Sequence, residues 1–166
     1  MCKLPTVYVT LITFLSLCVQ GCQHEQYVQR SISMSPTIED GEIFFVDKAA
    51  YKHNSPQRWD VVLLKPPEPY TNDGVLAFRV VGLPGETVTF RGNELLINGI
   101  IPRKPQALVG IEYVDKPQNT KAAIFEPLTL DGESYYVLGD NSSNANDSRM
   151  WGSVAKGKII GKVLNK

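Results

Sequence analysis

Residues 75–86 read VLAFRVVGLPGE, and this stretch decides the fold class of the chain. Its first part, residues 75–81, is apolar and rich in β-branched side chains, which is typical of a β-strand. Pro84-Gly85 then marks a chain reversal, because proline fixes φ and glycine accepts a positive φ. Gly82 lets another part of the backbone approach closely. The stretch therefore predicts a strand that ends in a tight turn.

Similar strand-like runs recur along the chain on both sides of this stretch. They lie at residues 43–46, 59–64, 87–90, 94–97, 108–114, 122–130, 135–138 and 159–164. Arg91-Gly92-Asn93 separates two of these runs at hairpin distance, and Asn98-Gly99 is a strong tight-turn dipeptide. We expect loops within residues 102–121, and we find no pattern for a long amphipathic helix. The chain is therefore predicted to be mainly β, with antiparallel sheets.

Composition limits the classes of function and site that the chain can have. Its 166 residues fit one domain plus an N-terminal segment, and 17 basic residues balance 17 acidic ones, which argues against nucleic acid as a partner. Cys2, Cys18 and Cys22 all precede the globular part, so a disulfide or a thiolate metal site is not expected there. His24 and His53 are isolated and are expected in solvated loops. We predict no metal and no cofactor.

The first 22 residues have the build of an export segment. Lys3 precedes a mostly apolar run at residues 4–19, shorter than the roughly 20 residues that cross a bilayer comfortably. The run ends in Val-Gln-Gly-Cys22, which resembles the lipobox of bacterial lipoproteins, with Gln20 in place of the usual small residue. Three alternatives remain: a membrane anchor, a lipidated Cys22, or a cleaved signal peptide. Each places a domain at residues 23–166 outside the cytoplasm.

Three motifs carry the candidate chemistry of this domain. Residues 31–37 read SISMSPT and residues 79–86 read RVVGLPGE, and the third motif consists of GDN at 139–141 together with DSR at 147–149. A serine close to a proline is by itself most often an ordinary turn. In this order, however, the motifs resemble those of the type I signal peptidases, membrane-anchored serine proteases that remove export signals. The resemblance spans roughly residues 30–164.

The resemblance assigns roles to the serine motif. It makes Ser33 the nucleophile, with an oxyanion hole formed by its own backbone N–H and by the Ser31 hydroxyl. Met34 and Pro36 would set the path of the chain and form a wall of the substrate groove. The implied substrates are the extended signal peptides of exported proteins, presented at the membrane.

The other motifs have supporting roles in the resemblance. The GDN sequence is expected to end a strand and begin a loop that packs against the active site. Asp147 and Arg149 are expected to form a charge pair that braces this loop, with Arg79 as a candidate third member, and an exposed pair of this kind contributes little alone. The remaining supporting residues are Gly82, Pro84, Gly85, Gly139, Asp140, Asn141 and Ser148.

The expected catalytic base is missing from its position. The family uses a Ser/Lys pair, yet the residue immediately before Arg79 is Phe78, which has no lone pair to accept a proton. Ala145 also stands where the family usually has a serine that hydrogen-bonds the lysine. Neither histidine matches the lysine position, and Lys65, the nearest lysine in sequence to this strand, is expected at a solvated strand end.

Two functions therefore remain open at the level of sequence. The first is a signal-peptidase-type endopeptidase whose activity is reduced or lost. The second is a non-catalytic relative that binds extended peptides by strand addition, as a pseudoprotease or as the partner subunit of an active peptidase. A surface lipoprotein without a peptide-related role would rest on Cys22 alone, and the retained serine motif argues against it.

Overall fold

The computed structural model describes residues 24–70, 74–115 and 127–166. Within these ranges the chain is mainly β, with one short α-helix and four 3₁₀ turns. The strands are β1 (His24–Val28), β2 (Ile43–Asp47), β3 (Val61–Leu64), β4 (Leu76–Gly82), β5 (Thr87–Arg91), β6 (Glu94–Ile97), β7 (Leu128–Thr129), β8 (Ser134–Leu138), β9 (Val154–Ala155) and β10 (Ile159–Val163). The helical elements are η1 (Ile32–Met34), η2 (Gln106–Leu108), η3 (Ser142–Asn144), η4 (Lys156–Lys158) and α1 (Ser148–Trp151).

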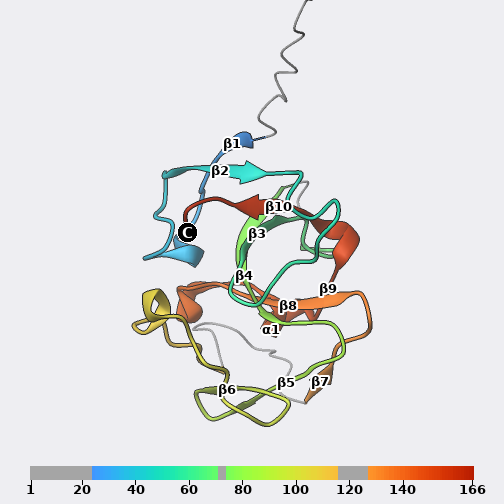
Figure 1. The fold of residues 1–166 in the computed structure, drawn as a ribbon. Helices are drawn as coiled ribbons and strands as arrows, with labels where there is room; N and C mark the ends of the chain where they lie inside the picture. The colour runs from blue at the N-terminus through green and yellow to red at the C-terminus, as the bar shows by residue number, and fades with distance from the viewer. Residues whose placement is uncertain (1–23, 71–73, 116–126) are drawn as a thin grey trace, which may run out of the picture.

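The strands form two sheets, one large and one small (Figure 1). The large sheet has seven strands in the order β1-β2-β10-β3-β4-β8-β9, and the small sheet has the order β6-β5-β7. All strand pairs within these sheets are antiparallel. This architecture confirms the predicted fold class.

Residues 75–86 form the predicted strand and turn, and this strand, β4, leads from the large sheet to the small one. It pairs with β3 on one side and β8 on the other, so Val62 faces Phe78 and Val80 faces Val137. The turn after β4 contains Gly85 at a φ of 80°. A Cβ atom at Gly82 would lie 2.6 Å from Val88, so this glycine allows the close approach of β4 to the small sheet.

The predicted hairpin turns are also present. Arg91 pairs with Glu94 across the β5–β6 turn. Asn98 and Gly99 have φ angles of 51° and 78°, the left-handed conformation that this dipeptide tolerates best.

Several predicted strands are shorter than expected or absent. Residues 108–114 are not a strand: the segment follows η2 as irregular chain, and its apolar residues Leu108, Ile111 and Tyr113 instead pack into the core beside the small sheet. Of the 122–130 run, the described part forms only the two-residue β7, and residues 122–126 lie outside the described ranges. The 59–64 run begins as β3 two residues late, because Trp59 takes a φ of 77°, which a strand does not accommodate.

Strands β1 and β9 were not predicted from the sequence. His24 therefore lies in an exposed strand rather than in a loop, whereas His53 lies in an exposed turn as expected. Strand β1 is mostly polar, and it owes its extended form to its five-residue pairing with β2. The predicted export segment and Cys22 lie outside the described residues. Within the described residues, no helix has the length and apolar character needed to cross a membrane.

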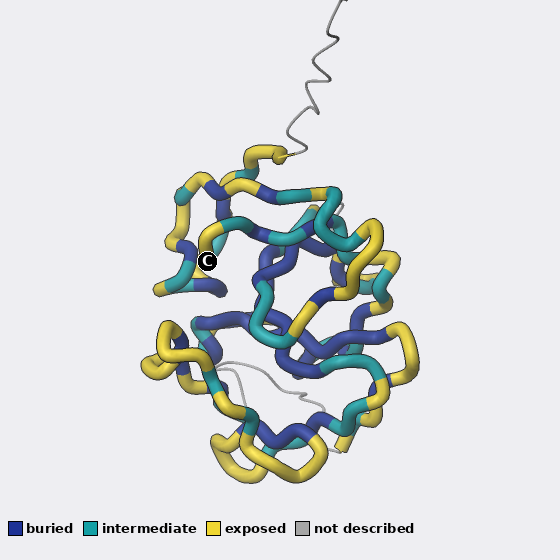
Figure 2. The backbone as a smooth tube through the Cα atoms, viewed as in Figure 1, coloured by how far each residue is buried: buried dark blue, intermediate teal, exposed yellow. Residues whose placement is uncertain are grey.

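The core has two parts, which Figure 2 shows as buried segments along the central strands. One cluster lies on the large sheet and includes Met34, Phe78 and Ala145. The other lies between β4, β8 and the small sheet, and it includes Val88 and Tyr136. Residues from the serine motif, β4 and the loop after β8 therefore meet in the first cluster, although they lie far apart in the sequence.

Candidate active site

Ser33 lies in the 3₁₀ turn η1, which follows the β1 ladder directly. The ladder continues beyond β1 because the Gln29 N–H donates to the Glu42 carbonyl oxygen at 2.9 Å. Ser31 caps the turn, since its hydroxyl oxygen accepts from the Ser33 N–H at 3.4 Å. The Met34 carbonyl oxygen then accepts from Thr37 and Ile38 at 2.8 and 3.0 Å. These backbone hydrogen bonds fix the position of Ser33 in the turn, and only 8% of the residue is exposed.

A compact polar cluster surrounds the Ser33 hydroxyl. Ser31 Oγ and Ser33 Oγ are 2.9 Å apart. The side-chain amide nitrogen of Gln29 lies 3.0 Å from the Ser31 carbonyl oxygen, 3.2 Å from Ser31 Oγ and 3.4 Å from Ser33 Oγ. Gln29 was missed from the sequence because nothing in its neighbourhood distinguishes it from a solvated glutamine. Its burial, at 6% exposed, results from the pairing of strands that are distant in sequence.

Phe78 lies inside the large sheet and is 1% exposed. It belongs to the same buried cluster as Met34 and Ala145. Its ring meets the indole of Trp151 edge-on, with centroids 6.1 Å apart and planes inclined at 61°. The described neighbours of Phe78 in this cluster are therefore apolar. Neither the Phe78 side chain nor the Ala145 side chain has an atom that could accept a proton from Ser33.

The loop after β8 lies directly against the serine turn. The Asn141 N–H donates to the Ser33 carbonyl oxygen at 3.0 Å. A Cβ atom at Gly139 would lie 2.4 Å from the Ala145 Cβ and 2.6 Å from the Ser33 carbonyl oxygen. The predicted packing of this loop against the candidate nucleophile is therefore present, and it depends on the small size of Gly139 and Ala145.

Asp140 binds three separate parts of the chain. Its carboxylate accepts from Arg79 Nε at 2.9 Å, from Arg79 Nη2 at 2.5 Å and from the Tyr113 hydroxyl at 2.9 Å, and it also accepts from the Thr37 hydroxyl. Arg79 was a candidate partner of the Asp147–Arg149 pair, and that assignment is wrong because its guanidinium pairs with Asp140. Burial, with the nearby Asp140 carboxylate, raises the pKa of Tyr113.

Asp147 and Arg149 form the expected ion pair at 2.6 Å, but the pair is buried rather than exposed. Asp147 also accepts from the Gly139 N–H at 2.9 Å, and Arg149 donates to the Ser142 carbonyl oxygen at 2.7 Å. The Ser148 hydroxyl accepts from the Val137 N–H at 3.0 Å. The pair thus fixes the start and the middle of the loop, and the loss of one partner would leave a buried charge unpaired.

The hydrogen bonds of the Ser33 hydroxyl within the described part of the chain are to Gln29 and Ser31, and three lysines form ion pairs with carboxylates instead. Lys48 pairs with Glu25, Lys162 with Asp60 and Lys166 with Glu42. Lys65 is exposed just after the end of β3, as expected, and its backbone N–H donates to the Lys158 carbonyl oxygen. Among the described residues there is no group of three or more histidine, cysteine, aspartate or glutamate side chains that could hold a metal ion.

A cavity of about 290 Å³ opens beside the serine turn. It extends from β1 to the start of β4, and most of its walls are apolar. Its lining residues are Tyr27, Val28, Gln29, Arg30, Ser31, Phe44, Leu63, Gly74, Val75, Leu76 and Ala77. We call this cavity the groove, and its position beside Ser31 would bring a bound chain to the polar cluster.

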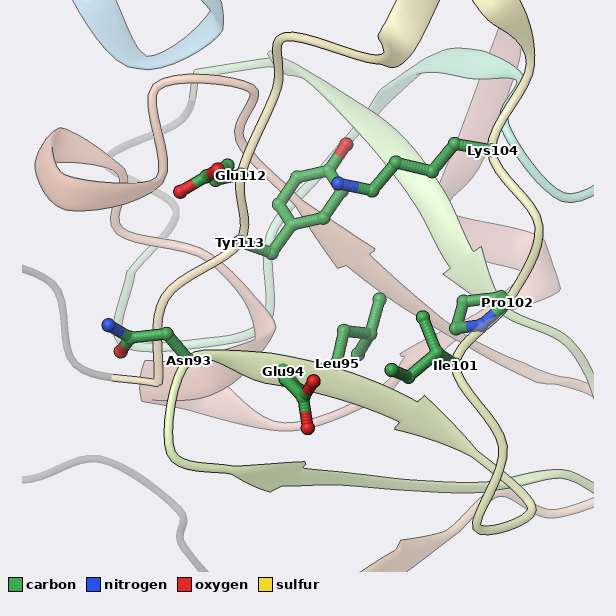
Figure 3. Close-up of a pocket in the computed structure, with 8 residues that line it drawn as sticks. All are labelled: Asn93, Glu94, Leu95, Ile101, Pro102, Lys104, Glu112 and Tyr113. Atoms are coloured by element: carbon green, nitrogen blue, oxygen red, sulfur yellow. The ribbon is translucent and has the colours of Figure 1, made fainter.

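A second cavity, of about 260 Å³, lies between β6 and the loop at residues 101–113 (Figure 3). The ammonium group of Lys104 lies 5.2 Å from the centre of the Tyr113 ring. Since the Tyr113 hydroxyl binds Asp140, this aromatic ring forms part of the wall between the second cavity and the supporting network of the serine turn.

Comparisons with known proteins agree on one family. The family model described as "Signal peptidase, peptidase S26" matches residues 3–165. A probable signal peptidase I-1 of Synechocystis sp. is 35% identical over an alignment of 167 positions, which covers 98% of this chain and 79% of that protein. A signal peptidase I of Leptolyngbya laminosa is 36% identical over 140 residues, or 81% of this chain and 64% of that protein. This chain therefore spans less than two thirds of the Leptolyngbya relative.

One solved structure provides an independent comparison of the fold. The crystal structure of a signal peptidase I from Enterococcus faecalis matches with a TM-score of 0.50 and 30% sequence identity. The match covers 66% of this chain and 97% of the other chain.

Proposed function

This chain belongs to the type I signal peptidase family, and from that premise we propose that it binds signal peptides of exported proteins without cleaving them at an ordinary rate. The proposal assigns residues 1–22 to membrane attachment and residues 23–166 to a domain outside the cytoplasm.

The observation that carries the proposal is the burial of Phe78 in an apolar cluster. A Ser/Lys protease needs a lysine whose pKa is lowered from about 10.4, so that a neutral amine can take the serine proton. Phe78 stands at the position that the resemblance assigns to this lysine, and it is 1% exposed. Loss of a base that acts as a unit with its nucleophile can lower kcat by a factor on the order of 10⁶.

Ala145 supports the same conclusion from a second position. It lies in the same cluster as Phe78 and carries no hydroxyl group that would hold an amine in place. An amine introduced alone at residue 78 would be buried without a partner, which is costly. We infer that the two positions changed together and that an apolar filling replaced the base.

The groove favours retained peptide binding. Its apolar wall includes Phe44, Leu63 and Val75, which suit the apolar part of a signal peptide. Strand β1 lies at one end of the large sheet, so its outer edge is suited to pair with an extended chain. The Ser31 hydroxyl, whose oxygen accepts from the Ser33 N–H at 3.4 Å, lies beside that N–H, as the implied oxyanion hole needs.

An apolar surface beside the groove favours a position at the membrane. Val28, Ile32, Ile43 and Phe45 are between 45% and 51% exposed, and Val28 and Ile43 are partners across β1 and β2. Exposed apolar groups that gather in this way mark sites of contact with proteins or membranes. Ser33 follows Cys22 by eleven residues, a tether of at most about 36 Å when extended. A membrane anchor or a lipidated Cys22 would therefore keep Ser33 near the bilayer.

The retained pair of serines favours a second candidate function, a slow endopeptidase. The Ser31 hydroxyl oxygen lies 2.9 Å from the Ser33 hydroxyl oxygen, so a candidate donor for an oxyanion stands beside the candidate nucleophile. An oxyanion hole and a binding groove can still leave a residual rate above that in water after the base is lost.

Cleavage of a membrane-inserted preprotein tests the proposal. We would compare the unaltered full-length protein with Ser33→Ala and with the double variant Phe78→Lys/Ala145→Ser. The expected result is that only the double variant releases the mature protein at a measurable rate, because it restores an amine and its hydroxyl partner.

Cleavage by the unaltered protein but not by Ser33→Ala would refute the loss of activity and require a base elsewhere. In that case Lys65→Ala would show whether Lys65 supplies it. Failure of the double variant to cut, although it folds, would refute the argument that the base alone is missing.

A further inference from the structure

The polar cluster of Gln29, Ser31 and Ser33 has more hydrogen-bond donors than its internal contacts use. The Gln29 amide carries two hydrogens and each serine hydroxyl carries one. The amide points at the Ser31 carbonyl oxygen and at both hydroxyl oxygens. Only one of the two hydroxyl hydrogens can lie along the 2.9 Å contact between the serines. The other hydroxyl hydrogen therefore remains available to an acceptor from outside.

These donors are fixed before any ligand arrives. Gln29 is 6% exposed and Ser33 is 8% exposed, so neither side chain is free to turn into bulk water. The backbone of Gln29 is bonded to Glu42 and Gly41, at 2.9 Å in each case. Fixed donors bind an acceptor more strongly than free ones do, because little ordering cost remains.

The charged residue in the lining of the groove is basic. Gln29, Arg30 and Ser31 are consecutive in the lining, and Arg30 is the charged one among the described residues that line the groove. The Arg30 side chain is exposed. The rest of the lining is mostly apolar, with Phe44, Leu63 and Ala77 among its residues. The lining of the groove thus combines an apolar wall with one basic residue and a group of hydrogen-bond donors.

A free carboxylate fits this group of donors better than an internal peptide bond does. A peptide carbonyl offers one neutral oxygen, whereas a carboxylate offers two oxygens and a negative charge. Hydrogen bonds to a charged acceptor are roughly twice as strong as those between neutral groups. Cleavage of an internal bond also needs a base, which Phe78 does not supply, while binding of a carboxylate needs none.

We propose that Gln29, Arg30, Ser31 and Ser33 form a site for the C-terminal carboxylate of a peptide whose apolar chain lies in the groove. The inference rests on the proposed function, because it assumes that the groove binds peptides. It narrows the ligand to a peptide that another protease has already cut, such as a released signal peptide.

The test is the affinity of the full-length protein for two forms of one peptide. The probe is a synthetic peptide of about ten mostly apolar residues that ends in Ala-Gln-Ala, prepared with a free C-terminal carboxylate and as the C-terminal amide. Isothermal titration at pH 7 should give a dissociation constant about tenfold lower for the acid than for the amide, from the added strength of bonds to a charged acceptor.

Three variants separate the carboxylate site from the rest of the groove. Gln29→Glu is nearly isosteric but places a carboxylate against the ligand, so it should abolish the preference for the acid. Ser31→Ala and Arg30→Gln should each reduce the preference severalfold, and the affinity for the amide should stay within about threefold. Arg91→Gln is the matched control, because Arg91 pairs with Glu94 on the β5–β6 hairpin and should leave both affinities unchanged.

The outcomes distinguish this inference from the proposed function. Equal affinity for the acid and the amide would overturn the carboxylate site and leave peptide binding intact. Failure of both peptides to bind would refute peptide binding itself, and with it the inference. Binding of palmitate without binding of the peptide acid would show that the site takes a lipid carboxylate, which would also overturn the inference.

Discussion

Replacement of Gly139 by alanine tests how the loop after β8 holds the serine turn. Gly139 has no positive φ, so its backbone accepts a side chain, and space is the only obstacle. The added methyl carbon would lie 2.4 Å from the Ala145 Cβ and 2.6 Å from the Ser33 carbonyl oxygen. Contacts this short require movement, and one of the two atoms belongs to the backbone of the serine turn.

The size of the effect follows from two opposing contributions. Glycine to alanine at a compatible backbone position stabilises a protein by about 0.4–1 kcal/mol, through the unfolded state. Overpacking of a tight site costs about 1–3 kcal/mol and sometimes more. Since both contacts are far inside van der Waals distance, we expect a net loss of about 1–3 kcal/mol. In a chain of this size, such a loss lowers Tm by roughly 3–10 °C.

The measurement is thermal and urea unfolding followed by circular dichroism, with Gly110→Ala as the matched control. A Cβ atom at Gly110 would meet no atom within 4 Å, so the control should unfold at or slightly above the Tm of the unaltered protein. In a double-mutant cycle, Ala145→Gly should recover only part of the loss, because the contact with Ser33 remains. If Gly139→Ala were as stable as Gly110→Ala, the packing of this loop against the serine turn would be refuted.

Two further predictions concern the buried polar groups. Asp140→Asn should destabilise the protein by about 3–5 kcal/mol in urea unfolding, because it leaves the buried Arg79 guanidinium without its counter-ion. The control is Glu94→Gln, in the exposed pair with Arg91, which should lower the free energy of unfolding by less than about 0.5 kcal/mol. Equal effects of the two substitutions would contradict the argument. Burial raises the pKa of both Tyr113 and Tyr136, so their phenols stay protonated in the folded state while those of the unfolded chain ionise near pH 10. The contribution of these two tyrosines to stability should therefore be constant below about pH 10 and fall above it by about 1.4 kcal/mol per pH unit for each tyrosine, less steeply in Tyr113→Phe. A flat profile between pH 9 and 11 would show that these phenols ionise normally.

Features set by short stretches of sequence were predicted well. The strand and turn at residues 75–86 and the turns at Gly92 and Asn98-Gly99 depend on local backbone preference, and all are present. The run at residues 108–114 has the composition of a strand but finds no partner strand among the described residues, so its apolar side chains pack without a ladder. Strand β1 shows the opposite case, since its polar residues are extended because β2 pairs with them.

The sequence alone identified the family, the mainly β fold, the serine turn and the absence of lysine at residue 78, because these features follow from residue identity and local spacing. Only the tertiary structure decided that Arg79 pairs with Asp140, that the Asp147–Arg149 pair is buried, and which polar groups meet Ser33. Arg79 selects Asp140, which is 61 positions away, and Gln29 reaches Ser33 from the end of the β1 ladder. Burial and partner choice depend on how distant strands pack, and composition carries no record of that packing.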